Sequence, residues 1–441
     1  MRHSLFATVV IGLIVAGCAK ENATDLTNTN TFIRYYNGGL DDEAIAVKEV
    51  NDGFIILSNT FVEPNDAAPY WKIKLTKTDL FGNVQWKKLY PEFAGEIVNT
   101  SGLSYKGYDL LVKEDANLNV TGYVVVGEDI NTTGISNPLI MQIDNLGENF
   151  NKVTLTAPGV SARAISKNPK NENYLILAQS GSNMFLAEFR ANPFSDTPSP
   201  VIWQKEYVAG TINNLVNKLF TNSAGNVYWG GTVTKNASTS KVRFIKTTQN
   251  SDLVESDPVI GNPLFNETAK DITRYGFGFA TIGTTNGKPG NTTGDTDILF
   301  RRLTEDGAEI PGQVKSYQLG GKEENGDQVE DLKGNEEGNS IYATQDGGLI
   351  LLGTVDSKVG TGSAEDTSGS TGRGEKDLYL IKINPFGDVA WTKILGSKFN
   401  DLGVSVIQTK DGGILVLGTS DISGTLKTVT LIKTDKNGNI E

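Results

Sequence analysis

One β-rich phrase occurs seven times along the chain, and this repetition constrains the fold more than any other feature. The clearest copy runs from Ile341 to Leu395, where short apolar runs are separated by Asp-Gly-Gly and Pro-Phe-Gly-Asp. Such runs are typical of β-strands joined by tight turns. The second strand of each copy is predicted to begin at Phe54, Tyr123, Tyr174, Val227, Phe279, Leu349 and Ile414, between 51 and 70 residues apart.

Each copy contains four predicted strands. Third strands such as LYLIKI and VTLIKT follow the second strands, and three copies carry a tryptophan in the fourth strand, at Trp86, Trp203 and Trp391. We interpret these tryptophans, and Trp229 in a second strand, as packing residues of the repeat. Four strands per unit at this period predict an all-β fold, a seven-bladed β-propeller of four-stranded antiparallel blades.

The two ends of the repeated region predict how the ring closes. The sequence stops at Glu441, just after the third strand of the seventh unit, and residues 32–37 precede the first unit. This segment, FIRYYN, aligns with the fourth strand that begins at Trp391. We therefore expect it to complete the last blade and to cover an edge that would otherwise be bare. Residues 32–441 are predicted to form one propeller domain.

Loop lengths predict a binding face. Loops after the first and third strands are mostly short, whereas the others hold the insertions, which span 60–70, 91–104, 128–138, 285–296, 318–339 and 355–376. In a blade these two kinds of loop emerge on opposite faces, and insertions gathered on one face of a repeat array usually mark the binding face. Neutral drift is the alternative, since long surface loops cost little stability.

Composition excludes several kinds of chemistry. The only cysteine is Cys18 and the only histidine is His3, so a chain without its first residues has no Ser-His-Asp or Cys-His catalysis, His-ligated zinc or disulfide framework. The net charge of −12 argues against nucleic acid as a partner, because phosphates would be repelled.

The N-terminus has the form of a secretory leader. Residues 1–17 contain Arg2 and then an uncharged apolar stretch that is too short to span a bilayer. The segment Val15-Ala16-Gly17-Cys18 resembles the lipobox of bacterial lipoproteins, which implies cleavage before Cys18 and acylation of that residue with palmitate-type chains. The polar residues 18–31 would then be a flexible tether. An ordinary cleavage site with an incidental cysteine is the alternative.

Candidate ligand-binding residues lie on the predicted long-loop face. Tyr70 and Trp71 end an insertion and could stack on a sugar or a partner, although strand-edge packing explains them as well. Carboxylates are frequent there, including Asp295, Asp297, Asp366 and Glu375. Converging oxygens can bind calcium, and the segment around Asp295 and Asp297 is the best candidate, but no cofactor is predicted and a solvated acidic loop is the simpler interpretation.

The repeat phrase resembles that of propellers found in lipoproteins of Bacteroidetes. The shared pattern is Asp-Gly-Gly, an apolar run and Gly-Thr, then Ile-Lys, a turn containing Gly, and Trp-x-Lys, and it is strongest in units one, six and seven. The resemblance implies a lipid-anchored, monomeric propeller of the bacterial outer membrane and assigns no catalytic residues.

Three functions stay open on the sequence alone. The first is a non-enzymatic scaffold that binds a protein or glycan through the long-loop face. The second is a carboxylate-based carbohydrate enzyme, a glycosidase or lyase, built over the central channel. The third is a structural component of an envelope assembly.

Overall fold

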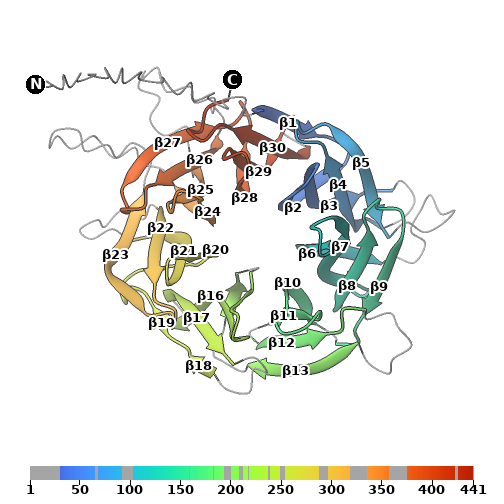
Figure 1. Cartoon of the computed structure of the whole chain (residues 1–441), viewed down its shortest axis with the longest axis horizontal. Coiled ribbons are helices and arrows are strands. Elements are labelled where there is room, and N and C mark those ends of the chain that lie inside the picture. The colour runs from blue at the N-terminus through green and yellow to red at the C-terminus, as the bar shows by residue number, and fades with distance from the viewer. Residues whose placement is uncertain are drawn as a thin grey trace, which may run out of the picture.

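The short apolar bursts of the sequence form thirty β-strands, arranged in seven antiparallel sheets around a central axis (Figure 1). The computed structural model describes residues 30–64, 68–91, 103–157, 159–181, 183–192, 200–207, 212–216, 218–236, 239–248, 254–287, 296–317, 335–356, 375–422 and 426–440. Within these residues the chain contains no helix long and apolar enough to cross a bilayer. The predicted seven-bladed β-propeller is confirmed.

The first three blades follow the four-strand pattern. Blade 1 comprises β2 (Asp41–Val50), β3 (Gly53–Val62), β4 (Tyr70–Thr78) and β5 (Val84–Tyr90). Blade 2 comprises β6 (Ser104–Glu114), β7 (Val120–Ile130), β8 (Ser136–Asp144) and β9 (Phe150–Thr154). Blade 3 comprises β10 (Ser161–Lys167), β11 (Tyr174–Ser180), β12 (Asn183–Phe189) and β13 (Val201–Tyr207).

The last three blades have the same order. Blade 5 comprises β20 (Asp271–Tyr275), β21 (Gly278–Thr285), β22 (Asp297–Leu303) and β23 (Glu309–Tyr317). Blade 6 comprises β24 (Glu336–Ala343), β25 (Leu349–Asp356), β26 (Lys376–Ile383) and β27 (Val389–Leu395). Blade 7 comprises β28 (Asp401–Gln408), β29 (Ile414–Asp421), β30 (Lys427–Thr434) and β1 (Phe32–Tyr36).

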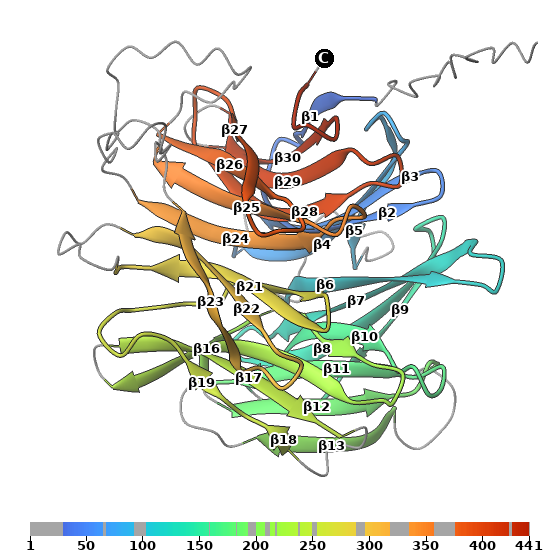
Figure 2. The same cartoon turned by 60° about the vertical axis from the view of Figure 1, so that its left-hand side comes forward.

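Blade 4 departs from the expected four strands. It comprises β14 (Ile212–Leu215), β15 (Phe220–Thr221), β16 (Val227–Asn236), β17 (Thr239–Thr247), β18 (Val254–Ser256) and β19 (Val259–Ile260). Both β14 and β15 pair with β16. Both β18 and β19 pair with β17, as can be followed in Figure 2. Pro258 lies between β18 and β19, and its nitrogen has no hydrogen for the ladder, so the outer strand is interrupted there.

The N-terminal strand closes the ring as predicted. β1 pairs antiparallel with β30, with Phe32 opposite Lys433 and Tyr36 opposite Val429. Phe32 is buried in a cluster that also contains Phe54 of blade 1 and Leu431 of blade 7. The first and last parts of the chain therefore share one sheet, and β30 has no exposed edge.

The hydrophobic core is divided among the blade interfaces. The described residues form seven apolar clusters, and each joins residues of two neighbouring blades. The second and third strands are covered on both sides, which explains why they are continuous apolar runs rather than alternating ones. Trp229 is completely buried, and Trp86, Trp203 and Trp391 pack against these clusters, so their structural interpretation is confirmed.

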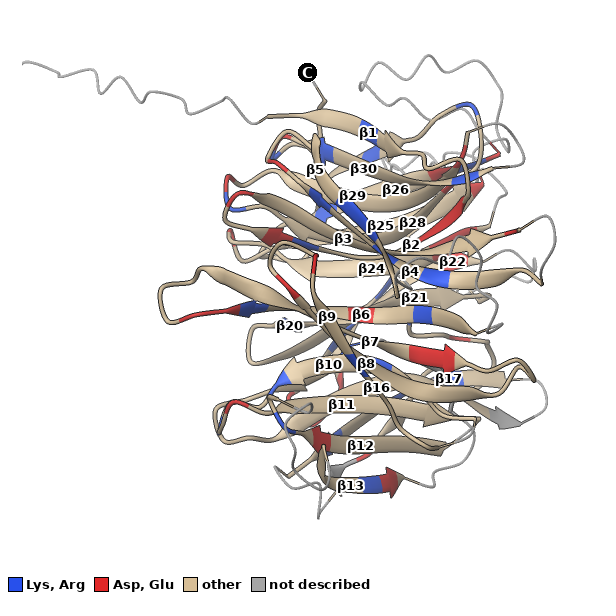
Figure 3. Ribbon diagram, turned by 90° about the vertical axis from the view of Figure 1, so that its right-hand side faces the viewer, with Lys and Arg blue, Asp and Glu red and all other residues tan. Residues whose placement is uncertain are grey.

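The strands of each blade run between two faces of the ring (Figure 3). We call the short-loop face the one that carries the turns after first and third strands, and the long-loop face the opposite one. Phe32 pairs with Lys433 close to the turn after β30, so β1 begins at the short-loop face. Much of the predicted insertion sequence on the long-loop face, namely 65–67, 92–102, 288–295, 318–334 and 357–374, lies outside the described residues.

Candidate functional site

In six of the seven blades the innermost part of the blade carries a four-residue motif, which places one variable side chain in the central channel. The motif consists of a small residue, the variable residue, a small or polar residue and an aliphatic residue. It occurs at 44–47, 107–110, 162–165, 269–272, 338–341 and 403–406. In five of these copies the ladder has a bulge at the variable residue, which turns that side chain out of the sheet. The variable residues that line the channel are Ile45, Tyr108, Arg163, Lys270, Asn339 and Val404.

The small first residue is required by the neighbouring blade. A Cβ atom on Gly338 would lie 2.3 Å from the carbonyl oxygen of Gly283, and one on Gly403 would lie 2.9 Å from Cγ of Leu352. The second strand of the preceding blade therefore passes directly behind each inner strand. This close approach allows side chains of one blade to bond the backbone of the next.

The polar third residue forms one kind of bond between blades. The carboxylate of Asp109 accepts a hydrogen bond of 3.0 Å from the N–H of Ile165, and Asp271 accepts one of 2.9 Å from Ile341. Ser340 continues the series, because its Oγ accepts a bond of 3.2 Å from the N–H of Val406. These side chains provide acceptors for backbone N–H groups on the inner strand of the next blade.

In four blades the sixth residue of the second strand, counted from the starts given in the sequence analysis, forms another kind of bond between blades, which we call the clasp. Its side-chain oxygen accepts a hydrogen bond from the N–H of the first motif residue in the following blade. The clasps join Asn59 to Gly107 at 2.8 Å, Thr232 to Ala269 at 3.0 Å, Thr354 to Gly403 at 3.0 Å and Thr419 to Ala44 at 3.0 Å. The Gly-Thr ending of the repeat phrase therefore has a structural role. In blade 5 the corresponding Oγ1 of Thr284 has no partner among the described residues.

Blades 2 and 3 lack the clasp residue and carry longer polar side chains in its place. Glu128 and Gln179 occupy the sixth position, and both line the channel. Glu128 accepts a hydrogen bond of 2.5 Å from the hydroxyl of Tyr108, and Gln179 donates one of 2.9 Å to the carbonyl of Gly181. The same two blades present Tyr108 and Arg163 at the variable position. We call these four residues, Tyr108, Glu128, Arg163 and Gln179, the polar wall.

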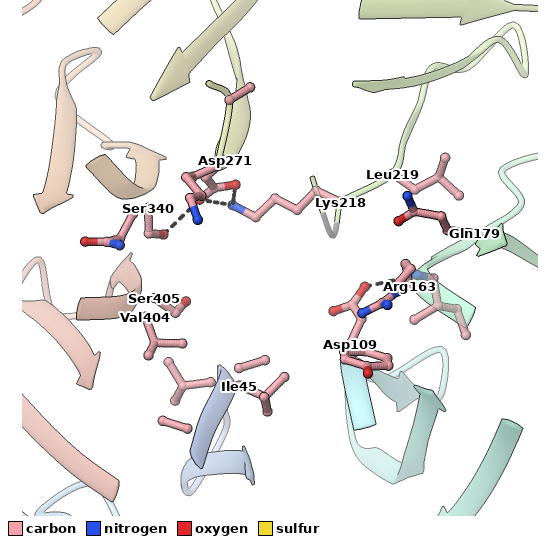
Figure 4. Close-up of a pocket in the computed structure, with 18 of the residues that line it drawn as sticks. Ile45, Asp109, Arg163, Gln179, Lys218, Leu219, Asp271, Ser340, Val404 and Ser405 are labelled. Carbon is pink, nitrogen blue, oxygen red and sulfur yellow. Dashed lines mark hydrogen bonds and ion pairs between the residues drawn. The ribbon is translucent and has the colours of Figure 1, made fainter. Parts of the chain in front are cut away.

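The channel has a volume of about 890 Å³. Its lining is chemically uneven, as Figure 4 shows: Ile45 and Val404 lie together on one side, and Arg163 lies beside Asp109 on another. Because a second strand runs from the short-loop face toward the long-loop face, its sixth residue lies in the half near the long-loop face. The polar wall is therefore near the long-loop mouth of the channel.

Arg163 and Tyr108 pack face to face in the polar wall. The guanidinium carbon of Arg163 lies 3.9 Å from the centre of the Tyr108 ring, a cation–π contact. Burial raises the pKa of the Tyr108 hydroxyl, and the nearby Arg163 only partly opposes this effect. The hydroxyl is therefore protonated at neutral pH and serves as the donor to Glu128.

On the opposite side of the channel, a charged network is internally satisfied. Lys218 forms an ion pair with Asp271 at 2.7 Å, and Asp271 also accepts hydrogen bonds from Ser340 Oγ at 2.8 Å and from two backbone N–H groups. Figure 4 shows these side chains pointing toward one another. All the strong acceptor positions of Asp271 are used, so this network connects blades rather than offering a binding group.

Asp109 has an unusual electrostatic setting. Burial raises the pKa of its carboxyl group, while Lys48 and the N–H groups of Ile165 and Leu110 lower it to a smaller extent. A raised carboxyl pKa is a property of general acids, but here the carboxylate is held by two backbone donors. Its geometry is that of a residue that joins blades 2 and 3 and contributes to the channel wall.

The predicted site residues that the structure describes lie away from the channel. Tyr70 is only 4% exposed at the start of β4, and Trp71 packs on Phe61 with ring centres 4.9 Å apart, while the Lys106 ammonium lies 3.8 Å from the Trp71 ring centre. Asp297 is buried and Glu375 is exposed, whereas Asp295 and Asp366 are outside the described residues, as is Cys18. Of the described residues predicted as ligand-binding, none lines the channel, and their role stays a prediction.

Among the described residues, no group of three or more His, Cys, Asp or Glu side chains is arranged to hold a metal ion. The turn at Asp435 resembles a calcium loop in sequence, but its carboxylate accepts hydrogen bonds from the N–H groups of Asn437 at 2.8 Å and Asn439 at 2.7 Å. This is the bonding of an ordinary hairpin turn.

Comparisons with known proteins support the fold alone. No family model and no curated protein matches the chain. A puromycin hydrolase mutant of known structure is 12% identical, with a TM-score of 0.51 over 90% of this chain and 53% of its own. The Penicillium chrysogenum α-L-arabinanase is 12% identical, with a TM-score of 0.42 over 93% of this chain and 99% of its own. The phage phi92 endosialidase is 9% identical, with a TM-score of 0.44 over 92% and 69%.

The residues of the polar wall were not among the predicted ligand-binding residues, because those predictions depended on insertions and carboxylate-rich loops. The signal that could have found them is a comparison of the copies position by position. At the sixth position of the second strand five copies have Asn or Thr, and only blades 2 and 3 have Glu128 and Gln179. Departures from a repeat's own structural rule are where functional residues are expected.

Proposed function

We propose that this chain is a non-enzymatic lipoprotein of the bacterial outer membrane that binds a glycan or protein through its long-loop face. The observation that carries the proposal is the replacement of the clasp residue in two adjoining blades. At these positions the chain gives up a bond between blades and instead presents Glu128 and Gln179 to the channel. Stability is commonly sacrificed in this way at binding sites.

The position of the N-terminus supports the choice of face. β1 begins at the short-loop face, so a lipid attached to Cys18 would hold the molecule from that side. The long-loop face and the polar wall would then point away from the membrane. Incorporation of labelled palmitate that is lost in Cys18→Ser would support the anchor, and labelling that persists in this variant would contradict it.

Restoring the repeat residue at the polar wall tests the binding role. Glu128→Thr reintroduces a short acceptor beside the inner strand of blade 3 but removes the acceptor of the Tyr108 hydroxyl, so we expect stability to change by no more than about 1 kcal/mol in either direction. Gln179→Thr removes the bond to the Gly181 carbonyl, and we expect a similarly small change. Binding of the full chain, in detergent, to a panel of immobilised neutral and acidic glycans and envelope proteins should weaken about tenfold or more.

Asn59→Thr is the matched control, because it keeps an acceptor for the N–H of Gly107 in blade 1 but loses the bond of 3.1 Å that the Asn59 amide donates to the Gly107 carbonyl. It should leave binding unchanged and lower stability by up to about 1 kcal/mol. Binding that is unaffected by both restoring variants would contradict the proposal and would leave drift as the explanation of the two positions.

A second set of variants tests the face itself. Asp356 pairs with Lys376 at the ends of β25 and β26, so residues 357–375 can be replaced by Asn-Gly as a two-residue hairpin turn. We expect the variant to fold and to bind less of its partner. Full binding by this variant would argue against this part of the long-loop face as the recognition surface.

A carbohydrate enzyme is the second candidate, and the raised pKa of Asp109 near Glu128 is the observation that favours it. A glycosidase uses a carboxylic acid of raised pKa together with a second carboxylate. Release of reducing ends from any member of the glycan panel, lost in Glu128→Gln, would establish this activity in place of the binding function.

A further inference from the structure

Among the described residues, several cations that line the channel form no ion pair. Four basic residues line it, and of these Lys218 is paired with Asp271. The other three, Lys48, Arg163 and Lys270, form no ion pair within 4.0 Å among the described residues. Asp109 and Glu128 also line the channel, so the basic residues give it no large positive charge, and the placement of the individual cations is what favours an anionic ligand.

Arg163 is the best placed of the three to recognise a specific group. Its guanidinium plane is supported by the Tyr108 ring at 3.9 Å, so the orientation of the donor fork is restricted before a ligand arrives. Its Nε is buried and has no hydrogen-bond partner among the described residues. A buried donor without an acceptor costs free energy, and an acceptor from a ligand would remove that cost.

The surroundings of Arg163 select the kind of anion. Glu128 and Arg163 both contact Tyr108, so a carboxylate lies close to the guanidinium without pairing with it. A dianion such as a phosphate monoester would be repelled by this carboxylate more strongly than a monoanion would. Glu128 is instead an acceptor for ligand hydroxyl groups, and the amide of Gln179 adds a group that can accept or donate.

We propose that the polar wall binds an acidic saccharide, with Arg163 holding its carboxylate and Glu128 and Gln179 holding neighbouring hydroxyl groups. This inference rests on the proposed binding function and names the ligand class for it. The geometry requires that the sugar enter from the long-loop mouth, where the polar wall lies. The apolar side of the channel, with Ile45 and Val404, offers a surface for the less polar face of the ring.

Calorimetric titration of the full chain in detergent tests the proposal with four probes. They are trigalacturonate, neutral galactotriose, galactose 6-phosphate and N-acetyltriglycine, which carries a peptide carboxylate. We expect trigalacturonate to bind most tightly. Arg163→Gln should weaken that binding about 10- to 100-fold, because it removes a charge-assisted bidentate contact. Arg163→Lys keeps the charge but not the fork and should give an intermediate loss.

Lys87→Gln is the matched control, because it removes the same charge from β5 at the outer rim, and it should bind normally. Circular dichroism and thermal unfolding of each variant show whether it is folded, and Arg163→Lys keeps the test valid if Arg163→Gln does not fold. Equal binding of galactotriose, or tighter binding of the phosphate or the peptide, would overturn the ligand class. Trigalacturonate binding that is unchanged in both Arg163 variants, or absent from the parent chain, would overturn the site.

The loop variant separates this inference from the proposed function. Retained trigalacturonate binding after replacement of 357–375, together with unchanged capture on the glycan and protein panel, would support the channel site while contradicting the role of that loop. If Arg163→Gln still weakens trigalacturonate binding when it is introduced into the loop variant, this result would also support the channel site.

Discussion

At the scale of single residues, the aspartate of Asp-Gly-Gly forms an ion pair with the lysine of Ile-Lys in the same repeat. Asp346 accepts hydrogen bonds from Thr344 at 2.5 Å and Gly348 at 2.9 Å, and it pairs with Lys382 at 2.9 Å. Blade 7 repeats the arrangement with Asp411 and Lys433. Two parts of the repeat phrase that are distant in sequence therefore form one ion pair near the short-loop face.

This ion pair makes stability depend on pH. Burial raises the pKa of Asp346, but the hydrogen bonds from Thr344, Lys382 and Gly348 outweigh that effect and hold the pKa at about 2. The unfolded value is near 4, so the carboxylate stabilises the fold above that pH, and the contribution is lost as the pH falls from about 4 to about 2.

We predict that Asp346→Asn lowers the free energy of unfolding at pH 7 by about 1–2 kcal/mol. The value is reduced from that of a fully buried pair because the Asp346 side chain is 56% exposed, although that of Lys382 is only 8% exposed. Urea unfolding at pH 7 and at pH 2.5 measures the difference, which should be smaller at the lower pH. Asp388→Asn, in an exposed turn, is the control, and an equal loss there would argue against the ion pair.

At the scale of elements, the clasp shows how separate sheets become one ring. Each blade packs on the next through an apolar cluster, and the clasp adds a directional bond that fixes the position of the inner strand. Thr354 uses its hydroxyl twice, since it accepts from the N–H of Gly403 and donates to Asn339 at 2.9 Å.

We predict that Thr354→Val destabilises the protein by about 1–3 kcal/mol, because the shape is kept while a buried N–H loses its acceptor. Thermal or urea unfolding measures this cost. Thr284→Val is a closely matched control, because Thr284 has the same position in blade 5 and its Oγ1 has no partner among the described residues. A similar cost for both variants would show that the clasp bond is not the cause.

At the scale of the whole molecule, closure depends on β1. This strand covers the edge of β30 and inserts Phe32, which is 5% exposed, between blades 7 and 1. Without it the last blade would have three strands and an unpaired edge.

We predict that Phe32→Ala destabilises the ring by about 3–5 kcal/mol and promotes self-association through the loosened edge. Unfolding experiments measure the first effect and light scattering the second. Tyr35→Ala is the control on the same strand, since Tyr35 is 42% exposed. If Phe32→Ala unfolds no earlier than Tyr35→Ala, closure by this strand contributes little to stability.

The sequence by itself determined the blade count, the closing strand and the turn chemistry. These features depend on local periodicity and on residues that turns require, such as Gly387 and Gly438. The strands and turns can therefore be recognised separately in each copy of the repeat. The irregular strands of blade 4 were not predicted, although Pro258 signals the break in the outer one.

Only the tertiary structure decided which side chains face the channel. A bulge reverses the alternation of a strand at one residue, so Arg163 and Tyr108 cannot be assigned to the channel from period-two patterns. The clasps join residues between 37 and 375 positions apart, such as Thr232 with Ala269 and Thr419 with Ala44, and they form only when neighbouring blades meet. The polar wall is visible as an exception to those bonds, and it therefore appears only once the blades are packed together.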